Sequence, residues 1–264
     1  MSTSPDSLHY PETHHPGAGG DEPPVVLLHG GNVANWMWEP QVAALSDRTV
    51  LTPHLPGFGA RVDEEWPGLD AAADDVVGRL DRLGAEGPVA LVGLSLGAVV
   101  ALHVLARHPG RVRSAMVTGA PLRRVGVGPR LASRLQLAAW DRAWFWKAQA
   151  AAFRLPPDSR TRYVDHGLSI RRDTAAGMLA EVYAGSAPAG LSRYDGPLLA
   201  LAGEKEPAVA RRSLRDIASA VPSAATRIAP GMHHIWNIED VDLFNEVLRA
   251  WLAGAVGPRL RPAR

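Results

Sequence analysis

Residues 89–102 read VALVGLSLGAVVAL, an apolar run in which Ser95 supplies the one hydroxyl side chain. The part that ends at Gly93 is typical of a strand buried on both faces, and residues 96–107 have the composition of a buried helix. Small residues at Gly93 and Gly97 allow a strand and a helix to approach closely. The stretch predicts a sharp strand-to-helix turn that raises the Ser95 hydroxyl above a sheet. The alternative is that Ser95 only caps the helix.

The rest of the chain repeats this alternation of buried strands and helices. Parallel sheets with helices on both faces arise from such an order, so we expect an α/β fold with a mostly parallel, doubly wound sheet. The patterns predict strands at residues 25–29, 48–53, 89–93, 112–118, 198–202 and 225–228, and helices at 69–83, 96–107 and 240–253.

One region lacks a strand pattern and divides the chain into parts. Residues 121–195 contain helical patterns only, so we expect a helical cap inserted into a core of residues 21–120 and 196–256. Residues 1–20 are expected to form a flexible arm with a weak edge strand near its end, and the basic tail from residue 258 to a frayed, solvated end.

Composition excludes several classes of function. The 264 residues carry a net charge of +1, which gives no electrostatic reason to expect nucleic acid or an anionic membrane as a partner. The sequence has no cysteine, so disulfides, thiolate catalysis and cysteine-based zinc sites are excluded. No apolar run has the length of a bilayer span, and the first residues lack a signal-peptide pattern. We expect a cytoplasmic monomer or homodimer that acts on a small molecule.

A serine hydroxyl attacks only when a neighbouring base takes its proton, and that base needs an orienting carboxylate. The stretch APGMHHIWNIED offers His233 and His234 on a loop before the last helix. The stretch LAGEKEP, directly after a predicted strand, offers Glu204 and Glu206. The order along the chain is therefore serine, acid, histidine, as in a nucleophile-elbow hydrolase.

The oxyanion of an acyl-transfer intermediate needs hydrogen-bond donors. The N–H of Leu96, just after the serine, is one candidate, and the N–H of Gly31 in the HGG turn after the first buried strand is the other. An ordinary glycine-rich turn is the alternative for HGG.

Taken together, these stretches resemble the α/β-hydrolase superfamily, in its small cap-bearing branch of esterases, haloperoxidases and C–C hydrolases. The matching segments are VVLLHGGNVANWMW, LTPHLPGFGAR, ALVGLSLGAVVALHVLARHP, LLALAGEKEP and APGMHHIWNIEDVDLFNEVLRAWL. They occur in the family's order and span most of the chain outside the cap. The resemblance implies neither an organic cofactor nor a metal.

The resemblance also narrows the choice among candidates. The family's catalytic histidine stands five residues before a glutamate that opens the last helix, and Glu239 stands in that relation to His234. It places the triad acid at Glu206, although relatives usually carry aspartate there, so Glu204 stays an alternative. His54 stands where relatives carry an aspartate, and we expect it to make a local hydrogen bond.

The cap contains the tryptophan-rich segment WDRAWFW. Its apolar stripe fits a packing face, whereas Trp146 and Phe153, on another helical face, are candidates for a ligand pocket. Asn32 and Trp236 are further predicted substrate contacts. The hypothesis is a serine hydrolase that cleaves an ester or lactone of a small, largely apolar substrate through an acyl-enzyme on Ser95. A C–C hydrolase, perhydrolase or acyltransferase would use the same triad, and a small-molecule receptor of low turnover is a different class.

Overall fold

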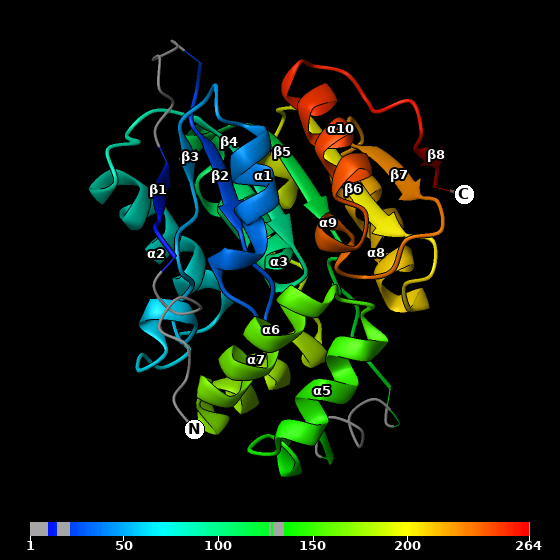
Figure 1. The fold of residues 1–264 in the computed structure, drawn as a ribbon. Coiled ribbons are helices and arrows are strands. Elements are labelled where there is room, and N and C mark those ends of the chain that lie inside the picture. Colours follow the sequence, from blue (N-terminus) through cyan, green and yellow to red (C-terminus); the bar gives the residue numbers. More distant parts are fainter. Residues whose placement is uncertain (1–9, 15–21, 127, 129–134, 264) are drawn as a thin grey trace.

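A single mixed sheet forms the centre of the molecule (Figure 1). The computed structural model describes residues 10–14, 22–126, 128 and 135–263. In the order β1-β3-β2-β4-β5-β6-β7-β8, the strands from β3 to β7 run parallel and the two edge strands run antiparallel to their neighbours. The strands are β1 (Thr13–His14), β2 (Val25–Leu28), β3 (Val50–Leu51), β4 (Val89–Leu94), β5 (Val112–Thr118), β6 (Leu198–Gly203), β7 (Ala225–Ala229) and β8 (Arg261–Pro262).

Helices cover both faces of this sheet. Helices α1 and α10 pack together on one face, and α2 and α3 pack together on the other (Figure 1). The core helices are α1 (Glu39–Ala44), α2 (Leu69–Arg82), α3 (Leu96–Arg107), α8 (Ala208–Ala220), α9 (Trp236–Glu239) and α10 (Val241–Leu252). Short 3-10 helices are η2 (Asn35–Trp38), η3 (Gly59–Arg61), η4 (Pro109–Arg111) and η5 (Leu191–Arg193). Within the described part of the chain, no helix is long and apolar enough to cross a membrane.

Among its described residues, the segment between β5 and β6 contains three helices of ten residues or more. They are α5 (Ala143–Ala152), α6 (Pro157–Ser169) and α7 (Arg172–Ala184), and they lie beneath the sheet in the view of Figure 1. Strands β4, β5 and β6 point their carboxyl ends toward this layer, which is where ligands bind in open parallel sheets.

The expected α/β architecture is confirmed, with differences at element ends. Strand β3 is shorter than the 48–53 predicted and covers only Val50–Leu51, which pair with β1 on one side and β2 on the other. The last helix begins one residue later than predicted, because the Asp240 carboxylate caps it by accepting from the N–H of Leu243 at 2.9 Å.

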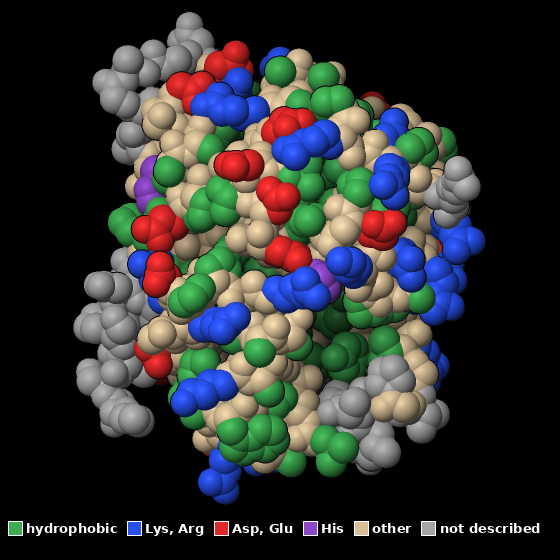
Figure 2. Space-filling model, turned by 45° about the vertical axis from the view of Figure 1, so that its right-hand side comes forward, with side chains coloured by type: hydrophobic (Ala, Val, Ile, Leu, Met, Phe, Trp, Pro, Cys, Tyr) green, Lys and Arg blue, Asp and Glu red, His purple; other side chains and the backbone are tan. Residues whose placement is uncertain are grey.

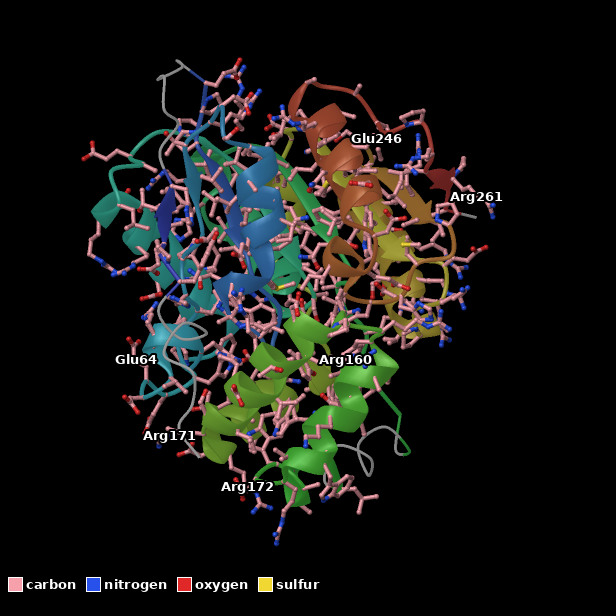
Figure 3. The ribbon with its side chains drawn as sticks, viewed as in Figure 1. Glu64, Arg160, Arg171, Arg172, Glu246 and Arg261 are labelled. Carbon is pink, nitrogen blue, oxygen red and sulfur yellow. The ribbon has the colours of Figure 1, made fainter. Side chains whose placement is uncertain are left out.

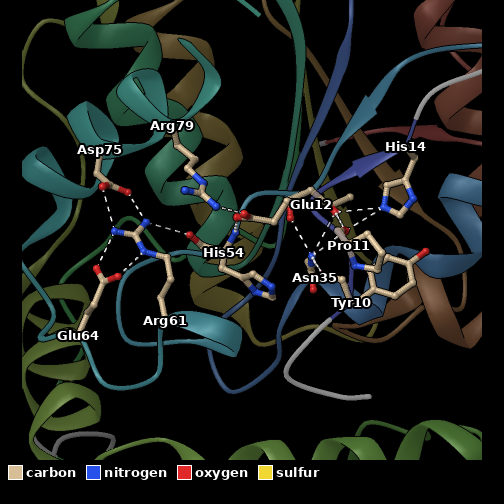
Figure 4. Close-up of polar contacts among 11 residues, drawn as sticks. Tyr10, Pro11, Glu12, His14, Asn35, His54, Arg61, Glu64, Asp75 and Arg79 are labelled. Carbon is tan, nitrogen blue, oxygen red and sulfur yellow. Dashed lines mark hydrogen bonds and ion pairs between the residues drawn. The ribbon is translucent and has the colours of Figure 1, made fainter. Parts of the chain in front are cut away.

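The N-terminal segment of residues 10–14 is attached to the core (Figure 4). Glu12 accepts from the N–H of His54 at 2.8 Å and forms an ion pair with Arg79 of α2. The Asn35 amide donates to the carbonyls of Tyr10 and Pro11. The bond to Glu12 uses the backbone N–H of His54, and neither ring nitrogen has a hydrogen-bond partner among the described residues, so the local hydrogen bond expected of the side chain is not found. The expectation of a flexible arm over residues 1–20 is therefore wrong for residues 10–14. The other residues of that arm lie outside the described part of the chain.

The basic tail also differs from expectation. Residues 261 and 262 form β8, which pairs with β7 at the far edge of the sheet instead of fraying. The sequence pattern is too short and too proline-rich to reveal a two-residue strand.

The strand and helix at the junction of β4 and α3 are in close backbone contact. A Cβ added at Gly97 would lie 2.2 Å from the carbonyl oxygen of Leu28, and one at Gly93 would lie 2.4 Å from the carbonyl oxygen of Gly97. Side chains at these positions would therefore push α3 away from β2 and β4.

We predict that Gly97→Ala lowers the free energy of unfolding by about 3 kcal/mol or more, because the contacted atoms are backbone atoms that cannot swing aside. Gly110→Ala is the matched control, since a Cβ there meets nothing within 4 Å. Urea denaturation of the two variants measures the difference. Equal stabilities would contradict the proposed packing constraint.

Candidate active site

Ser95 occupies the sharp turn between β4 and α3. Its φ and ψ are 57° and −115°, a backbone conformation that residues other than glycine rarely adopt. The N–H of Ser95 donates to the carbonyl of Thr118 at 2.9 Å, which ties the turn to the end of β5. The hydroxyl makes no capping hydrogen bond to α3, so the reading of Ser95 as a helix cap is wrong. A strained backbone with an uncommitted side chain is typical of a functional residue.

Ser95 opens into a cavity of about 300 Å³ between the sheet and the inserted helices. A recess with hydrophobic side chains is visible on the face in Figure 2. Of the predicted site residues, six line this cavity: Gly31, Asn32, Ser95, Leu96, Phe153 and His234. The remaining described lining is mostly apolar, with Gln136, Gln149 and Tyr183 as further polar groups, and contains no Asp, Glu, Lys or Arg.

His234 reaches the cavity from the loop between β7 and α9. Its side chain is 23% exposed, and its Nδ1 lies 3.4 Å from Oε1 of Glu206, whose side chain is fully buried. Burial of the imidazole is the largest single influence and lowers its pKa, but the negative charge of Glu206 and its contact with the ring together outweigh burial, so the pKa of His234 is raised above 6.5. The Phe153 ring lies 5.8 Å from the imidazole, centroid to centroid.

Glu206 has no other polar partner among the described residues. Neither carboxylate oxygen accepts a hydrogen bond there, and the contact with His234 is an ion pair slightly too long for a good hydrogen bond. A buried carboxylate without donors is costly, and a cationic imidazole reduces that cost. The pair is therefore arranged to favour a positive charge on His234.

Glu204 faces a different part of the molecule. Its carboxylate accepts from the N–H of Gly231 at 2.7 Å and forms an ion pair with Arg261 at 3.3 Å. Glu204 thus holds the turn after β7, and of the two candidate acids only Glu206 contacts the imidazole. The two residues point apart because the chain turns after β6 and is not extended there.

His233 is occupied by Glu239. The Glu239 carboxylate accepts from the N–H of His233 at 2.8 Å and contacts its Nδ1 at 2.7 Å. These two contacts fix the loop that presents His234. The spacing that selected His234 in the sequence thus has a physical basis in the neighbouring residue.

Gly31 and Leu96 are neighbours in the structure. A Cβ added at Gly31 would lie 3.7 Å from the side chain of Leu96, and neither N–H donates to another described residue. His29, which the sequence analysis did not select, holds this turn: its Nδ1 contacts the carbonyl of Gly30 at 2.8 Å and its Nε2 accepts from Leu55 at 3.0 Å. Burial lowers the pKa of His29 to about 3, so this ring stays neutral.

Gly119, at the end of β5, is a further site residue that the sequence analysis missed. A Cβ there would lie 2.9 Å from His234 and 3.0 Å from Glu206, and its φ is +68°. Only glycine leaves room for the histidine and the acid to meet. The signal in the sequence is the glycine of TGAP, directly after a buried strand.

Two predicted substrate contacts are wrong. Trp146 is fully buried among the inserted helices, and its indole donates to the carbonyl of Trp140 at 2.8 Å. Trp236 is fully buried in the core, and its indole donates to Thr118 at 2.9 Å. Neither ring lines the cavity, because an apolar ring in an amphipathic helix most often packs inside.

A group of three or more His, Asp or Glu side chains arranged to hold a metal ion is absent from the described residues.

Comparison with known proteins places the chain in a family. Residues 25–247 match the model of the alpha/beta hydrolase family. This chain belongs to that family. A pimeloyl-[acyl-carrier protein] methyl ester esterase from Neisseria meningitidis is 35% identical over 36% of this chain and 35% of the relative. A 2-hydroxymuconate semialdehyde hydrolase from a Pseudomonas species is 36% identical over 40% of this chain and 38% of the relative.

These sequence matches span well under half of each relative. The fold as a whole is similar to a solved enol-lactonase from Burkholderia xenovorans, with a TM-score of 0.75, 21% identity and coverage of 91% of this chain and 96% of that one. This likeness supports the fold and gives no information on the reaction.

We predict that Glu206→Gln reduces the turnover of a p-nitrophenyl ester by about a hundredfold or more, because the amide cannot stabilise a cationic imidazole. Glu204→Gln is the matched control and should stay within about threefold of the parent, since its carboxylate only holds a turn. Steady-state kinetics of both variants measure the effect. A larger loss in the Glu204 variant would assign the acid to that residue.

We further predict that the acid limb of kcat/KM against pH lies above pH 6.5, because a base must be neutral and the pKa of His234 is raised. In Glu206→Gln the limb should move to lower pH, since burial then lowers the pKa without an opposing charge. The residual activity of that variant across pH 4 to about 9 measures the shift. A limb that stays in place would show that another group controls it.

Proposed function

We propose that the chain is a serine hydrolase that cleaves a carboxylic ester or lactone of a small, uncharged substrate. The single observation that carries the proposal is the uncommitted hydroxyl of Ser95, held in a strained turn at the wall of the cavity that His234 also lines. Family membership supports hydrolysis as the type of reaction.

In the first half of the reaction, Ser95 Oγ attacks the carbonyl carbon and His234 takes the hydroxyl proton. The charge on the carbonyl oxygen is stabilised by the amides of Gly31 and Leu96, which have no described partner and so need not break an existing bond. His234 then protonates the leaving alkoxide, which departs as an alcohol and leaves an ester on Ser95.

In the second half, a water molecule takes the place of the alcohol. His234 removes its proton, the hydroxide attacks the Ser95 ester, and the same imidazole returns the proton to the serine oxygen as the acid leaves. In both halves Glu206 stabilises the imidazolium, which is why a buried carboxylate beside His234 is useful in spite of its cost.

The walls of the cavity limit the substrate. Its volume of about 300 Å³ is at the lower end for ligand sites, which favours a small acyl group. Apart from Ser95 and His234, its described lining offers apolar side chains, amides and the Tyr183 hydroxyl, and no lysine or arginine to pair with a substrate carboxylate. An uncharged ester therefore fits better than the anionic substrates that a C–C bond hydrolase of this branch would take, although the similarity to the semialdehyde hydrolase keeps that reaction as the alternative.

We predict a burst of p-nitrophenol from p-nitrophenyl butyrate, equal to one equivalent per chain, followed by steady turnover. A small organophosphorus reagent should label Ser95 with loss of activity, and Ser95→Ala should remove both the burst and the label while the protein stays folded. Stopped-flow absorbance and mass mapping are the measurements. A burst without turnover would favour the receptor, and a label on another residue would contradict the proposal.

A further inference from the structure

A second, larger hollow lies on the side of α8 away from the catalytic cavity. It has a volume of about 880 Å³ and lies between α8, the end of β7 and the edge strand β8. We call it the arginine cleft; it is lined by Glu204, Ala208, Arg211, Arg212, Arg215, Ile228, Arg261, Pro262 and Ala263. Lys and Arg side chains gather on the right-hand flank of the face in Figure 2, and Arg261 is labelled at the sheet edge in Figure 3.

The positive charge in this cleft is not neutralised by the protein. Arg211, Arg212 and Arg215 are exposed and form no ion pair with a carboxylate in the described part of the chain. The one carboxylate of the cleft, Glu204, is already engaged by Arg261 and by the amide of Gly231. Many other surface arginines are paired, such as Arg107 with Asp74 and Arg249 with Asp47.

The spacing of these arginines along α8 concentrates the charge. Arg211 and Arg215 are four residues apart and therefore lie on one stripe of the helix, where like charges repel. Arg212 stands beside them, with its Nε donating to the carbonyl of Ala208 at 3.2 Å and its other guanidinium nitrogens left available. In a chain with a net charge of only +1, such a local excess is stabilised best by an anion from outside.

We propose that the arginine cleft binds a small molecule that bears two or more phosphate charges. Guanidinium groups pair with phosphate oxygens through two parallel hydrogen bonds, and the cleft presents guanidinium groups from two walls, α8 and β8. Ala208, Ile228 and Pro262 provide an apolar floor for the uncharged part of such a ligand.

The shape of the cleft selects a small molecule over an acidic protein. Its volume lies within the range of small-ligand sites, and the arginines line a concave site. The site is distinct from the catalytic cavity although both share α8: Val209 and Ala210 line the cavity, whereas Ala208 and Arg211 line the cleft. The proposal therefore does not depend on the reaction at Ser95.

The test is calorimetric titration of the full chain with inorganic pyrophosphate, at an ionic strength held constant with KCl. We expect binding of one pyrophosphate per chain. Arg211→Gln/Arg215→Gln should weaken that binding by about tenfold or more for each charge removed. The matched control is Arg113→Gln/Arg172→Gln, which removes two exposed arginines outside the cleft that also lack a described ion pair and should leave the affinity unchanged.

Hydrolysis of p-nitrophenyl butyrate and the far-ultraviolet circular dichroism spectrum show whether the variants stay folded, and neither should change. Absence of pyrophosphate binding to the parent would overturn the proposal, as would equal loss in the control variant. Equal affinity for citrate would replace phosphate by general polyanion binding. Binding of a poly-aspartate peptide without binding of pyrophosphate would show a protein-docking surface instead.

Discussion

The structure depends on the close approach of α3 to the strands that flank its first turn. The Cβ of any residue other than glycine at position 97 would overlap the backbone of β2. Glycine at this position therefore sets the distance between the first turn of α3 and strand β2. That distance holds Ser95 in a conformation it would not adopt alone. The energy for this strain comes from the buried apolar surface of β4 and α3, whose side chains are almost all inaccessible to water.

A second constraint acts on the histidine. His234 comes from a loop, and loops hold side chains poorly unless other contacts fix them. Here Glu239 fixes the preceding residue, Glu206 lies behind the imidazole, and Gly119 leaves the space in which they meet. The three groups belong to three separate segments, and their arrangement is possible because parallel strands bring the loops after their carboxyl ends to one edge of the sheet.

Charge is distributed in two opposite ways on the two sides of α8. The cavity at Ser95 has no Asp, Glu, Lys or Arg in its described lining, so Glu206 is the carboxylate nearest to His234 and no other charged side chain of the lining opposes its effect. The arginine cleft on the other side has an excess of positive charge exposed to water. One helix therefore separates an apolar site from a strongly basic one, and each side suits a different kind of molecule.

The sequence by itself determined the six central strands, three of the core helices, the turn at Ser95 and the histidine loop. Hydrophobic periodicity and glycine spacing are local properties that are written directly in the chain. Strand β4 and helix α3 were predictable from residues 89–107, the parallel sheet from the alternation of strands and helices along the chain, and the final helix to within one residue at each end. The choice of His234 over His233 came from the resemblance to the family, whose catalytic histidine stands five residues before a glutamate such as Glu239.

Only the tertiary structure decided which side chains meet. Glu204 and Glu206 are equivalent in the sequence, but the turn after β6 sends one to Gly231 and the other to His234. Trp146 and Trp236 have large aromatic side chains of the kind that often line pockets, yet both are fully buried in the interior. The roles of Gly119 and His29 and the presence of the arginine cleft were not predictable from the sequence, because each depends on residues far away in the chain. Distance in space between such segments is set by the packing of the whole sheet, which no local pattern encodes.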